Sequence, residues 1–470
     1  MRGVLIFGVF VLSIFFGVAA GLFGMQALVL LLPIGVAAAL MLDYRVGIIF
    51  VAFVLPFSSA SILPQARGLN PITYAIVGST LLLALRWASG KQKIIFPPKV
   101  IIICLVIPIV FGGLIGTSFV NIAQKNFAGL GFEGTYETTT YLKQFIYRPL
   151  NFVLFSVLVA NAVSASKNPH RFVHLFAIMV IMPVLLLSLG TLASGEGLGE
   201  HRRVISSLGM HYNEYGKLMA FAFGPMLYVT FAVRGTERLF FAVVTLIVLF
   251  GVALTFARAS YLAVLTTVII FIWQSKQART KFLVLGSMLV FILIAPSEIL
   301  DRAIYGLDRS AIDDARAGSQ NEAFSSGRIG GWLVLLPDVE LSPIFGRGTS
   351  STAWSTAVSR GDYPSTHPHS LYLQILLDIG FLGLILLLYL YYRLVQVMRY
   401  LSRKDDIHES LRAFFAGSAA SFVGILVLSF TGGYWYPHVE QSYFWFCLGL
   451  VFCYWPNVHS NKHHSSQASA

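Results

Sequence analysis

Charged residues are scarce in this sequence: Lys, Arg, Asp and Glu together make up 11% of its 470 residues. Hydrophobic residues make up 56%, and they gather in runs of about 18 or more, the length that a helix needs to cross a bilayer. These two features exclude an ordinary soluble globular protein. We therefore expect an all-α polytopic integral membrane protein.

Cysteines and other candidate metal ligands are also few. The three cysteines, Cys104, Cys447 and Cys453, each lie inside an apolar run and offer neither a disulfide framework nor metal-ligand spacing. We expect them to be small buried hydrophobic side chains. The pair His367 and His369 has no third ligand nearby, so the sequence predicts no metal site and no cofactor.

The long apolar runs predict about 14 transmembrane helices. At the first of them a signal peptide is the competing interpretation, which we reject because no clear small-residue cleavage site is followed by a polar start. The runs lie near residues 3–23, 25–42, 46–64, 71–87, 100–120, 148–165, 172–193, 215–233, 239–256, 259–274, 282–297, 371–392, 412–431 and 437–455.

The distribution of charge predicts the orientation. If the N-terminus lies inside, most of the 33 Lys and Arg residues fall on inner segments, while most of the 21 Asp and Glu residues fall outside. This division follows the positive-inside rule. The net charge of +12 is therefore explained by topology, and we expect no nucleic-acid partner.

One outward connection, residues 298–370, is far longer than a turn, which favours a functional loop. Its apolar run Trp332–Leu336 predicts a short helix on the membrane surface. We expect five parts in the chain: an N-terminal bundle (1–200), central helices with outward arginines (201–297), this long loop (298–370), C-terminal helices (371–456) and a disordered inner tail (457–470).

The predicted spans lack charges near their centres, which disfavours an ion-coupled transporter. Ionisable residues collect instead at the predicted outer boundary. This distribution indicates a site at the outer leaflet. The residues concerned are Arg148, Arg202, Arg203, Lys217, Arg258, Arg328, Arg347, His367, His369 and Asp378.

Arginines near one outer cavity would suit a lipid diphosphate. The guanidinium group is a permanently charged planar fork that binds phosphate oxygens in pairs. Arg258 begins a predicted span directly after another ends, and Arg203 precedes a span by a short segment. The alternative is that each arginine contacts phospholipid head groups at the interface.

His369 directly precedes the span that begins at Leu371. This depth suits contact with a sugar hydroxyl, and an imidazole can act as a general base near neutral pH. The alternative is that His369 caps the following helix, a task that Ser370 could perform equally well.

Several motifs in the second half of the chain together resemble the O-antigen ligase and polymerase superfamily. R-x-x-x-W spans Arg328 to Trp332, S-P-I-F-G-R-G spans Ser342 to Gly348, and H-P-H-S-L-Y-L-Q-x-x-x-D-x-G-x-x-G spans His367 to Gly383. Two upstream pieces are similar too: Arg203 through Asn213 to Gly216, and T-x-A-R-A-S ending at Ser260.

The resemblance implies a multi-span, metal-independent glycosyltransferase of the C type (GT-C) in the bacterial inner membrane, with its site facing the periplasm. Such enzymes take a glycan from undecaprenyl diphosphate. The expected partners are that lipid-linked donor and an acceptor glycan, either a second lipid-linked repeat or lipid A-core. A polymerase would also be expected to work with a chain-length regulator.

Carried over by motif, the essential loop histidine of the family falls on His369, and its periplasmic arginines fall on Arg203, Arg258 and Arg328. In the mechanism that this implies, the arginines hold the diphosphate and stabilise the charge that develops as it leaves. His369 accepts the proton of the acceptor hydroxyl.

Four further residues near these motifs are accessory candidates: Arg202, Arg347, His367 and Asp378. The sequence departs from the family at two places, with Ser370 where Asn is common and Asp378 where Glu is common. The first departure removes an amide that could contact the acceptor, whereas the second keeps the charge on a shorter side chain.

Three activities within the superfamily remain open: polymerisation of repeats, ligation to lipid A-core, and protein glycosylation. The many outward arginines and the high span count favour a polymerase. From other classes, a lipid-oligosaccharide flippase would predict internal repeats and a polar path through the bilayer, and neither is evident in the sequence. A purely structural membrane scaffold would not need the long loop with its Arg and His pattern.

Overall fold

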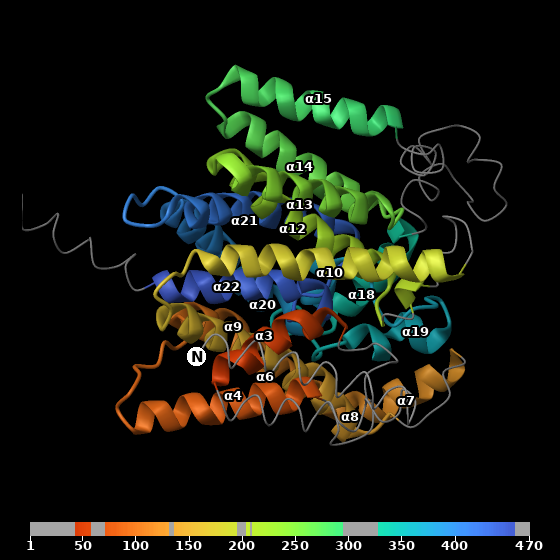
Figure 1. Cartoon of the computed structure of the whole chain (residues 1–470). Helices are drawn as coiled ribbons and strands as arrows, with labels where there is room; N and C mark the ends of the chain where they lie inside the picture. The colour runs from red at the N-terminus through yellow and green to blue at the C-terminus, as the bar shows by residue number, and fades with distance from the viewer. Residues whose placement is uncertain are drawn as a thin grey trace, which may run out of the picture.

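The structure is a computed structural model that describes residues 43–57, 71–130, 136–194, 204–206, 209–294 and 328–455. Every regular element in these ranges is a helix, which confirms the all-α prediction. The longer helices run side by side in a layered bundle, and α18, α19 and α7 lie together at one end of it (Figure 1). The expected spans near 3–23 and 25–42 lie outside the described residues.

The first half of the described chain supplies one side of the bundle. Its elements are α3 (Tyr44–Val54), η1 (Leu55–Phe57), α4 (Pro71–Ala88), α5 (Lys99–Ile101), η2 (Ile102–Val106), α6 (Ile107–Gly116), η3 (Thr117–Phe119), α7 (Val120–Gly129), α8 (Thr138–Leu142), η4 (Lys143–Tyr147), α9 (Arg148–Ser164) and α10 (Arg171–Ser194).

The second half supplies α12, α21 and α22 inside the bundle, α15 at its edge and the segment at its end (Figure 1). Its elements are α12 (Tyr212–Ala232), α13 (Gly235–Ala253), α14 (Arg258–Gln274), α15 (Ala278–Ile294), α18 (Arg328–Glu340), η7 (Ser351–Trp354), α19 (Thr356–Arg360), α20 (Leu371–Leu401), α21 (Glu409–Leu428), η8 (Ser429–Thr431), η9 (Val439–Gln441) and α22 (Ser442–Tyr454).

Within the described residues, six helices are long and apolar enough to cross a membrane, and three shorter apolar helices accompany them. The protein is therefore a polytopic membrane protein. The six are Lys99–Gly129, Thr138–Ser164, Arg171–Gly190, Gly235–Ala253, Leu371–Leu401 and Glu409–Thr431. The shorter helices are Tyr44–Phe57, Ile72–Ala88 and Arg258–Gln274.

Helix α12 is buried along most of its length and packs against α13, α14 and α21. Where α12 and α21 cross, a Cβ added to Gly224 would lie 2.5 Å from the carbonyl oxygen of Gly417. The Gly224 amide donates to Ser421 Oγ at 2.9 Å. Small residues of this kind let helix backbones approach closely inside a membrane.

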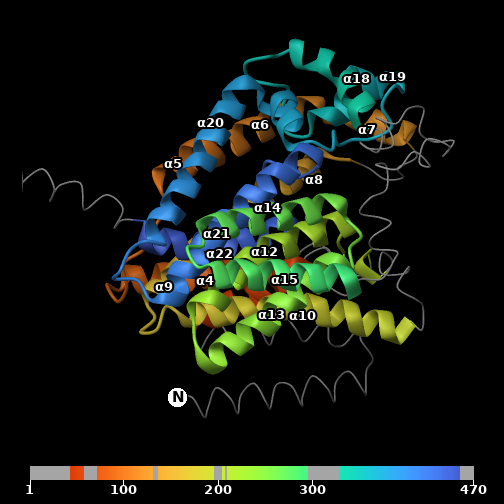
Figure 2. The same ribbon diagram turned by 90° about the horizontal axis from the view of Figure 1, so that it is seen from above.

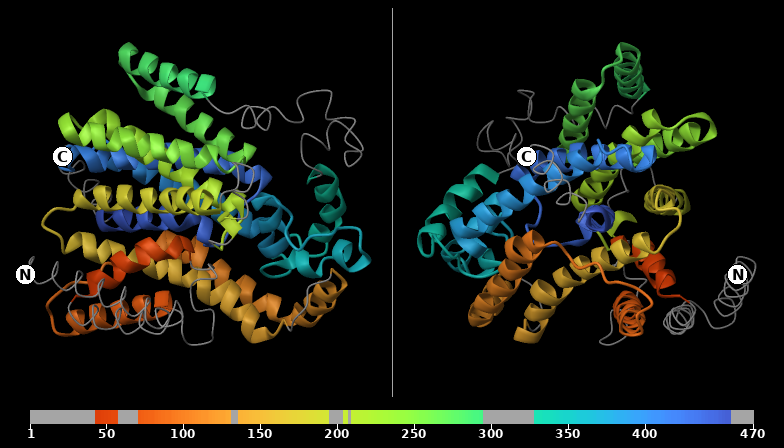
Figure 3. Two further views of the ribbon diagram at one scale, coloured as in Figure 1. Left: turned by 45° about the vertical axis from the view of Figure 1, so that its right-hand side comes forward. Right: turned by 90° about the vertical axis from the view of Figure 1, so that its left-hand side faces the viewer.

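Helix α20 runs beside α5 and α6 and diverges from the group formed by α12, α14 and α21 (Figures 2 and 3). The segment from α18 to the start of α20 lies over that end of α20 (Figure 2). It includes the short helix expected around Trp332–Leu336, which the structure confirms as part of α18.

The middle of α20 is broken at Gly380, whose backbone angles are φ 68° and ψ −168°. The loop of the S-P-I-F-G-R-G motif fills the break. The Phe381 amide donates to the Pro343 carbonyl at 2.8 Å, and the Arg347 amide donates to the Leu377 carbonyl at 2.9 Å. A Cβ at Gly380 would lie 2.3 Å from the carbonyl oxygen of Ile344. The loop motif and the glycine in α20 therefore form one packed unit.

We predict that Gly380→Ala lowers the free energy of unfolding by about 3 kcal/mol, because it combines a forbidden backbone conformation with a clash against backbone. Gly286→Ala in α15 is the matched control, since no heavy atom lies within 4 Å of its added Cβ. That change should stay within about 1 kcal/mol and favour stability. Unfolding of the purified protein in detergent measures both, and equal effects would contradict the account.

Candidate functional site

His369 stands in a strained backbone conformation at the entrance to α20. Its φ is 52°, in the left-handed region that residues other than glycine seldom adopt. Such strain persists where surrounding contacts enforce it and often marks functional sites. Ser370 is the N-cap of α20 and its side chain accepts from the Leu373 amide. His369 is therefore not the cap of this helix.

Several hydrogen bonds hold the His-Pro-His triplet. The His369 amide donates to His367 Nδ1 at 2.9 Å. Trp332 Nε1 of α18 donates to the Pro368 carbonyl at 2.8 Å, and the Tyr363 hydroxyl donates to the His367 carbonyl at 2.9 Å. The R-x-x-x-W motif thus has a structural task, because its tryptophan fixes the backbone that carries His369.

Positive charge surrounds His369. Partial burial, followed by the charges of Arg328, Lys217 and His211, lowers the pKa of His369 to about 4. The imidazole is therefore neutral at pH 7 and has a free lone pair on one ring nitrogen. A neutral histidine among cations is an arrangement that suits an anionic ligand.

Arg328 is the predicted arginine that the structure brings to His369. It is the first residue of α18, it is half-buried, and burial lowers its pKa. Its charge acts on His369 and also on Tyr363. Arg202 and Arg203 lie outside the described residues, so their roles stay predictions.

Arg258 begins α14, directly after a turn in which Phe256 has a φ of 51°. The turn packs on the start of α12: a Cβ at Gly216 would lie 2.3 Å from Ser260 Oγ. Gly216 precedes Lys217, so the T-x-A-R-A-S motif lies against the same end of α12 as the cations near His369. A role for Arg258 in binding diphosphate stays a prediction.

Arg347 and Asp378, two predicted accessory residues, bond to groups of the protein itself. Arg347 Nη1 lies 3.1 Å from Asp338 Oδ1. The Asp378 carboxylate accepts from the Ser351 amide, the Ser351 hydroxyl and Trp435 Nε1, each at 2.8 Å. These bonds tie η7 and the segment before α22 to α20. Both residues thus hold the segment that carries the site.

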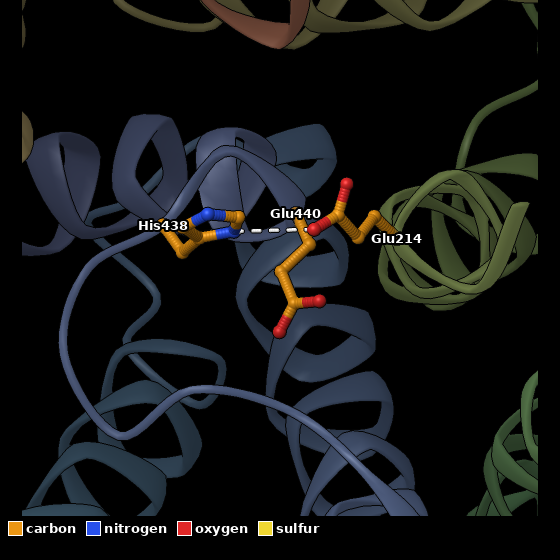
Figure 4. A group of neighbouring side chains, drawn as sticks. All are labelled: Glu214, His438 and Glu440. Atoms are coloured by element: carbon orange, nitrogen blue, oxygen red, sulfur yellow. Dashed lines mark ion pairs between the residues drawn. The ribbon is translucent and has the colours of Figure 1, made fainter. Parts of the chain in front are cut away.

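The sequence indicates Lys217 as an outer-boundary residue but does not point to Glu214, His438 or Glu440, which lie near it at the start of α12 and in the segment before α22. Lys217 Nζ lies 2.8 Å from Glu440 Oε2, and both side chains are buried. His438 Nδ1 lies 3.8 Å from Glu214 Oε1. Figure 4 shows the His438 imidazole facing the Glu214 carboxylate, with the Glu440 carboxylate turned away from this pair. Charged residues inside otherwise apolar segments were the signal that could have revealed this group.

Among the described residues, Glu214, His438 and Glu440 have ligand atoms within 4.8 Å of one another, as a metal site would require. Lys217 already binds one oxygen of Glu440, and an ammonium group so close disfavours a cation. The geometry therefore fits an ion-pair network better than a metal centre. The expectation of a metal-independent site stays a prediction.

Two hollows meet at Tyr434. The first, which we call the apolar groove, lies between α12, α20, α21 and α22 and has Lys217 and Glu440 at a polar position. Its other lining is mostly apolar and includes Leu371, Leu390, Leu394, Phe422, Phe444 and Leu448. The second, which we call the polar cavity, measures about 140 Å³, and its lining includes Arg148, His367, Gln374, Tyr436 and His438. Tyr434 lines both.

Comparison with known families agrees with this geometry. Residues 242–388 match the model of the Wzy_C family, described as O-antigen ligase. The match includes α14, α18, His369 and most of α20. This part of the chain is thus a Wzy_C O-antigen ligase domain, a family of glycan-transfer enzymes of the O-antigen ligase and polymerase type. No curated protein sequence matches the chain.

The charges around His369 lead to a pH prediction. Its imidazole should titrate near pH 4, and Arg328→Gln should raise that pKa toward the usual value of about 6.5, because one neighbouring cation is lost. Since the unfolded chain binds the proton more tightly, this residue's contribution to stability should increase as the pH rises from about 4 to about 6.5.

Histidine resonances in isotope-labelled protein, followed by NMR against pH, measure the pKa. Arg360→Gln, at the exposed end of α19, is the control and should leave the His369 titration unchanged. A His369 pKa near 6.5 in the unaltered protein would show that the predicted burial and charges do not act on it.

Proposed function

We propose that this protein transfers a glycan from undecaprenyl diphosphate to an acceptor sugar at the periplasmic face of the bacterial inner membrane, and that it polymerises O-antigen or exopolysaccharide repeats. One observation carries the proposal: a neutral His369 lies among cations near the meeting of an apolar groove and a polar cavity. It does so within a Wzy_C domain.

The apolar groove suits the polyprenyl tail of such a donor. Its walls come from α12, α20, α21 and α22 and also from α5 and η2, and its polar position carries the ammonium group of Lys217 beside the Glu440 carboxylate. A lipid diphosphate needs both an apolar channel for the tail and cations for its head. Lys217 and Arg328 would meet the diphosphate near His369, together with Arg203 and Arg258 in the roles that the family motifs assign them.

In the proposed reaction, His369 accepts the proton of an acceptor hydroxyl, whose oxygen forms a bond to the anomeric carbon of the donor. The bond from that carbon to the diphosphate breaks, and the diphosphate leaves with the electron pair. Cations stabilise the developing negative charge. Because the diphosphate is already a good leaving group, the step requires neither a general acid nor a metal.

The low pKa of free His369 is consistent with this role. An imidazole whose conjugate acid has a pKa of about 4 is a weak base. Donor binding would place a diphosphate against the cations that depress that pKa, and the added negative charge would raise it. His369 would therefore become an effective base only when the donor is present.

The finer architecture belongs to the same proposal. We propose about 14 transmembrane helices in a GT-C arrangement, with the parts 1–200, 201–297, 298–370, 371–456 and 457–470 as predicted and the 298–370 loop in the periplasm. The many arginines expected on the outer side support a polymerase, which must hold two lipid diphosphates. The family description supports ligation to lipid A-core as the second candidate.

Reconstitution in liposomes tests the function. With undecaprenyl-diphosphate oligosaccharide as the only substrate, a ladder of products would support polymerisation, whereas product only after addition of lipid A-core would support ligation. His369→Ala should reduce the rate by about 100-fold or more. His170→Ala, in the connection before α10, should not. Lipid transport across the bilayer without any transfer would indicate a flippase instead.

A further inference from the structure

The polar cavity contains buried polar atoms that have no hydrogen-bond partner. Two of the side chains that line it provide such atoms, His367 Nε2 and Gln374 Oε1. The Nδ1 atom of a third lining residue, His438, faces Glu214 Oε1 at 3.8 Å instead. A buried polar atom left without a partner costs about 1–3 kcal/mol. Two of them at one hollow are therefore a reason to expect a ligand there.

The hydrogen bonds around His367 determine what its free nitrogen offers. His367 Nδ1 accepts the amide of His369, and burial lowers the pKa of His367 well below its usual value. The neutral ring therefore carries its proton on Nε2, which is a donor. Gln374 Oε1 is an acceptor, and the side chain of Gln374 also hydrogen-bonds Tyr436. The cavity thus presents an unused acceptor, Gln374 Oε1, and a donor, His367 Nε2, that approaches the Gly433 backbone without forming a full hydrogen bond.

A hydroxyl group can satisfy both atoms, because it donates one hydrogen bond and accepts others. The rest of the lining combines aromatic rings with polar side chains, among them Gln144, Arg148 and Thr366. The ring centroids of Tyr434 and Tyr436 are 5.3 Å apart, and those of Phe145 and Tyr436 are 5.7 Å apart. Aromatic walls with a few placed polar groups are typical of small-molecule sites. The volume of about 140 Å³ far exceeds the roughly 10–15 Å³ that one water requires.

We propose that the polar cavity is a binding subsite for a hydroxyl-bearing sugar ring of the glycan acceptor. The proposal rests on the proposed function, since it identifies this hollow as the place where the growing glycan is held beside His369. The His369 amide donates a hydrogen bond to His367. A sugar ring bound at His367 therefore lies next to His369, the residue that would deprotonate the hydroxyl of the neighbouring sugar. Gln374 and His438 are then specificity-determining residues.

The test uses the full chain in nanodiscs and the lipid-free oligosaccharide released by mild acid from the lipid-linked repeat. Calorimetry should show that Gln374→Leu weakens binding of the oligosaccharide at least tenfold, because the hydrogen-bond acceptor Gln374 Oε1 is lost. Gln396→Leu makes the same change on the same helix, away from the cavity, and should bind normally. If Gln374→Leu does not fold, His438→Leu tests the same cavity.

Two competitors identify what the cavity takes. Inorganic pyrophosphate should not displace the oligosaccharide. Displacement would overturn the proposal and make the cavity an anion site that includes Arg148. Undecaprenyl-diphosphate monosaccharide distinguishes the acceptor from the donor glycan: continued binding of the oligosaccharide supports the acceptor, and displacement overturns that assignment in favour of the donor sugar.

His369→Ala separates this proposal from the proposed function. It should reduce the rate of transfer by about 100-fold or more while the oligosaccharide still binds with unchanged affinity. If the unaltered protein binds the oligosaccharide but shows no transfer, the proposed function is contradicted and the sugar subsite still stands. Two results would overturn the sugar subsite: transfer by a protein that does not bind the oligosaccharide, and equal binding by Gln374→Leu and the unaltered protein. Either would show that the polar cavity holds only water.

Discussion

The arrangement of the site depends on the backbone hydrogen bonds between the 342–348 loop and the broken middle of α20. Gly380 opens the helix, and the loop supplies a carbonyl at Pro343 and an amide at Arg347 to the groups thus released. A helix break inside a membrane is tolerated only where other groups satisfy its backbone. The loop that does so is continuous with η7, α19 and the His-Pro-His triplet, so one set of bonds positions everything up to His369.

Around the 342–348 loop and α20, some buried polar groups have all their hydrogen-bond partners, and others lack a partner. The Asp378 carboxylate uses its oxygens on Ser351 and Trp435. At the polar cavity, Gln374 Oε1 and His367 Nε2 lack partners, and His369 keeps a strained backbone beside Arg328 and the Lys217–Glu440 ion pair. Completed networks make a rigid scaffold, whereas open ones are stable only if a ligand or water completes them. This division separates the supports of the site from its binding surfaces.

Much of the fold could be predicted from the sequence, because apolar runs and helix signals are local. The helix after His369, the cap at Ser370 and the short helix after Arg328 all follow from nearby residues. The Lys217–Glu440 pair could not be predicted, because 223 residues separate its members and the pair exists only where α12 meets the segment before α22. Local patterns contain no information on such contacts.

The same reason explains which candidate residues lie together in the structure and which do not. His369 and Arg328 come from one loop and its flanking helices, and the structure brings the charge of Arg328 close to His369. Asp378 was an accessory candidate because it stands where the family often has Glu, but its partners Ser351 and Trp435 come from distant segments. A binding role for Gln374 could not be predicted, because an amide side chain at the start of a helix is ordinary. Whether its Oε1 has a hydrogen-bond partner depends on which distant segments pack against it.

The central claim is that the cations near His369 bind the diphosphate of a polyprenyl donor whose tail lies in the apolar groove. A structure of the protein in nanodiscs with undecaprenyl diphosphate tests this most directly. The account predicts diphosphate density in contact with Arg328 and Lys217, and tail density along α20 and α21. Density for the lipid elsewhere, with the groove closed by side chains and no anion near His369, would contradict it.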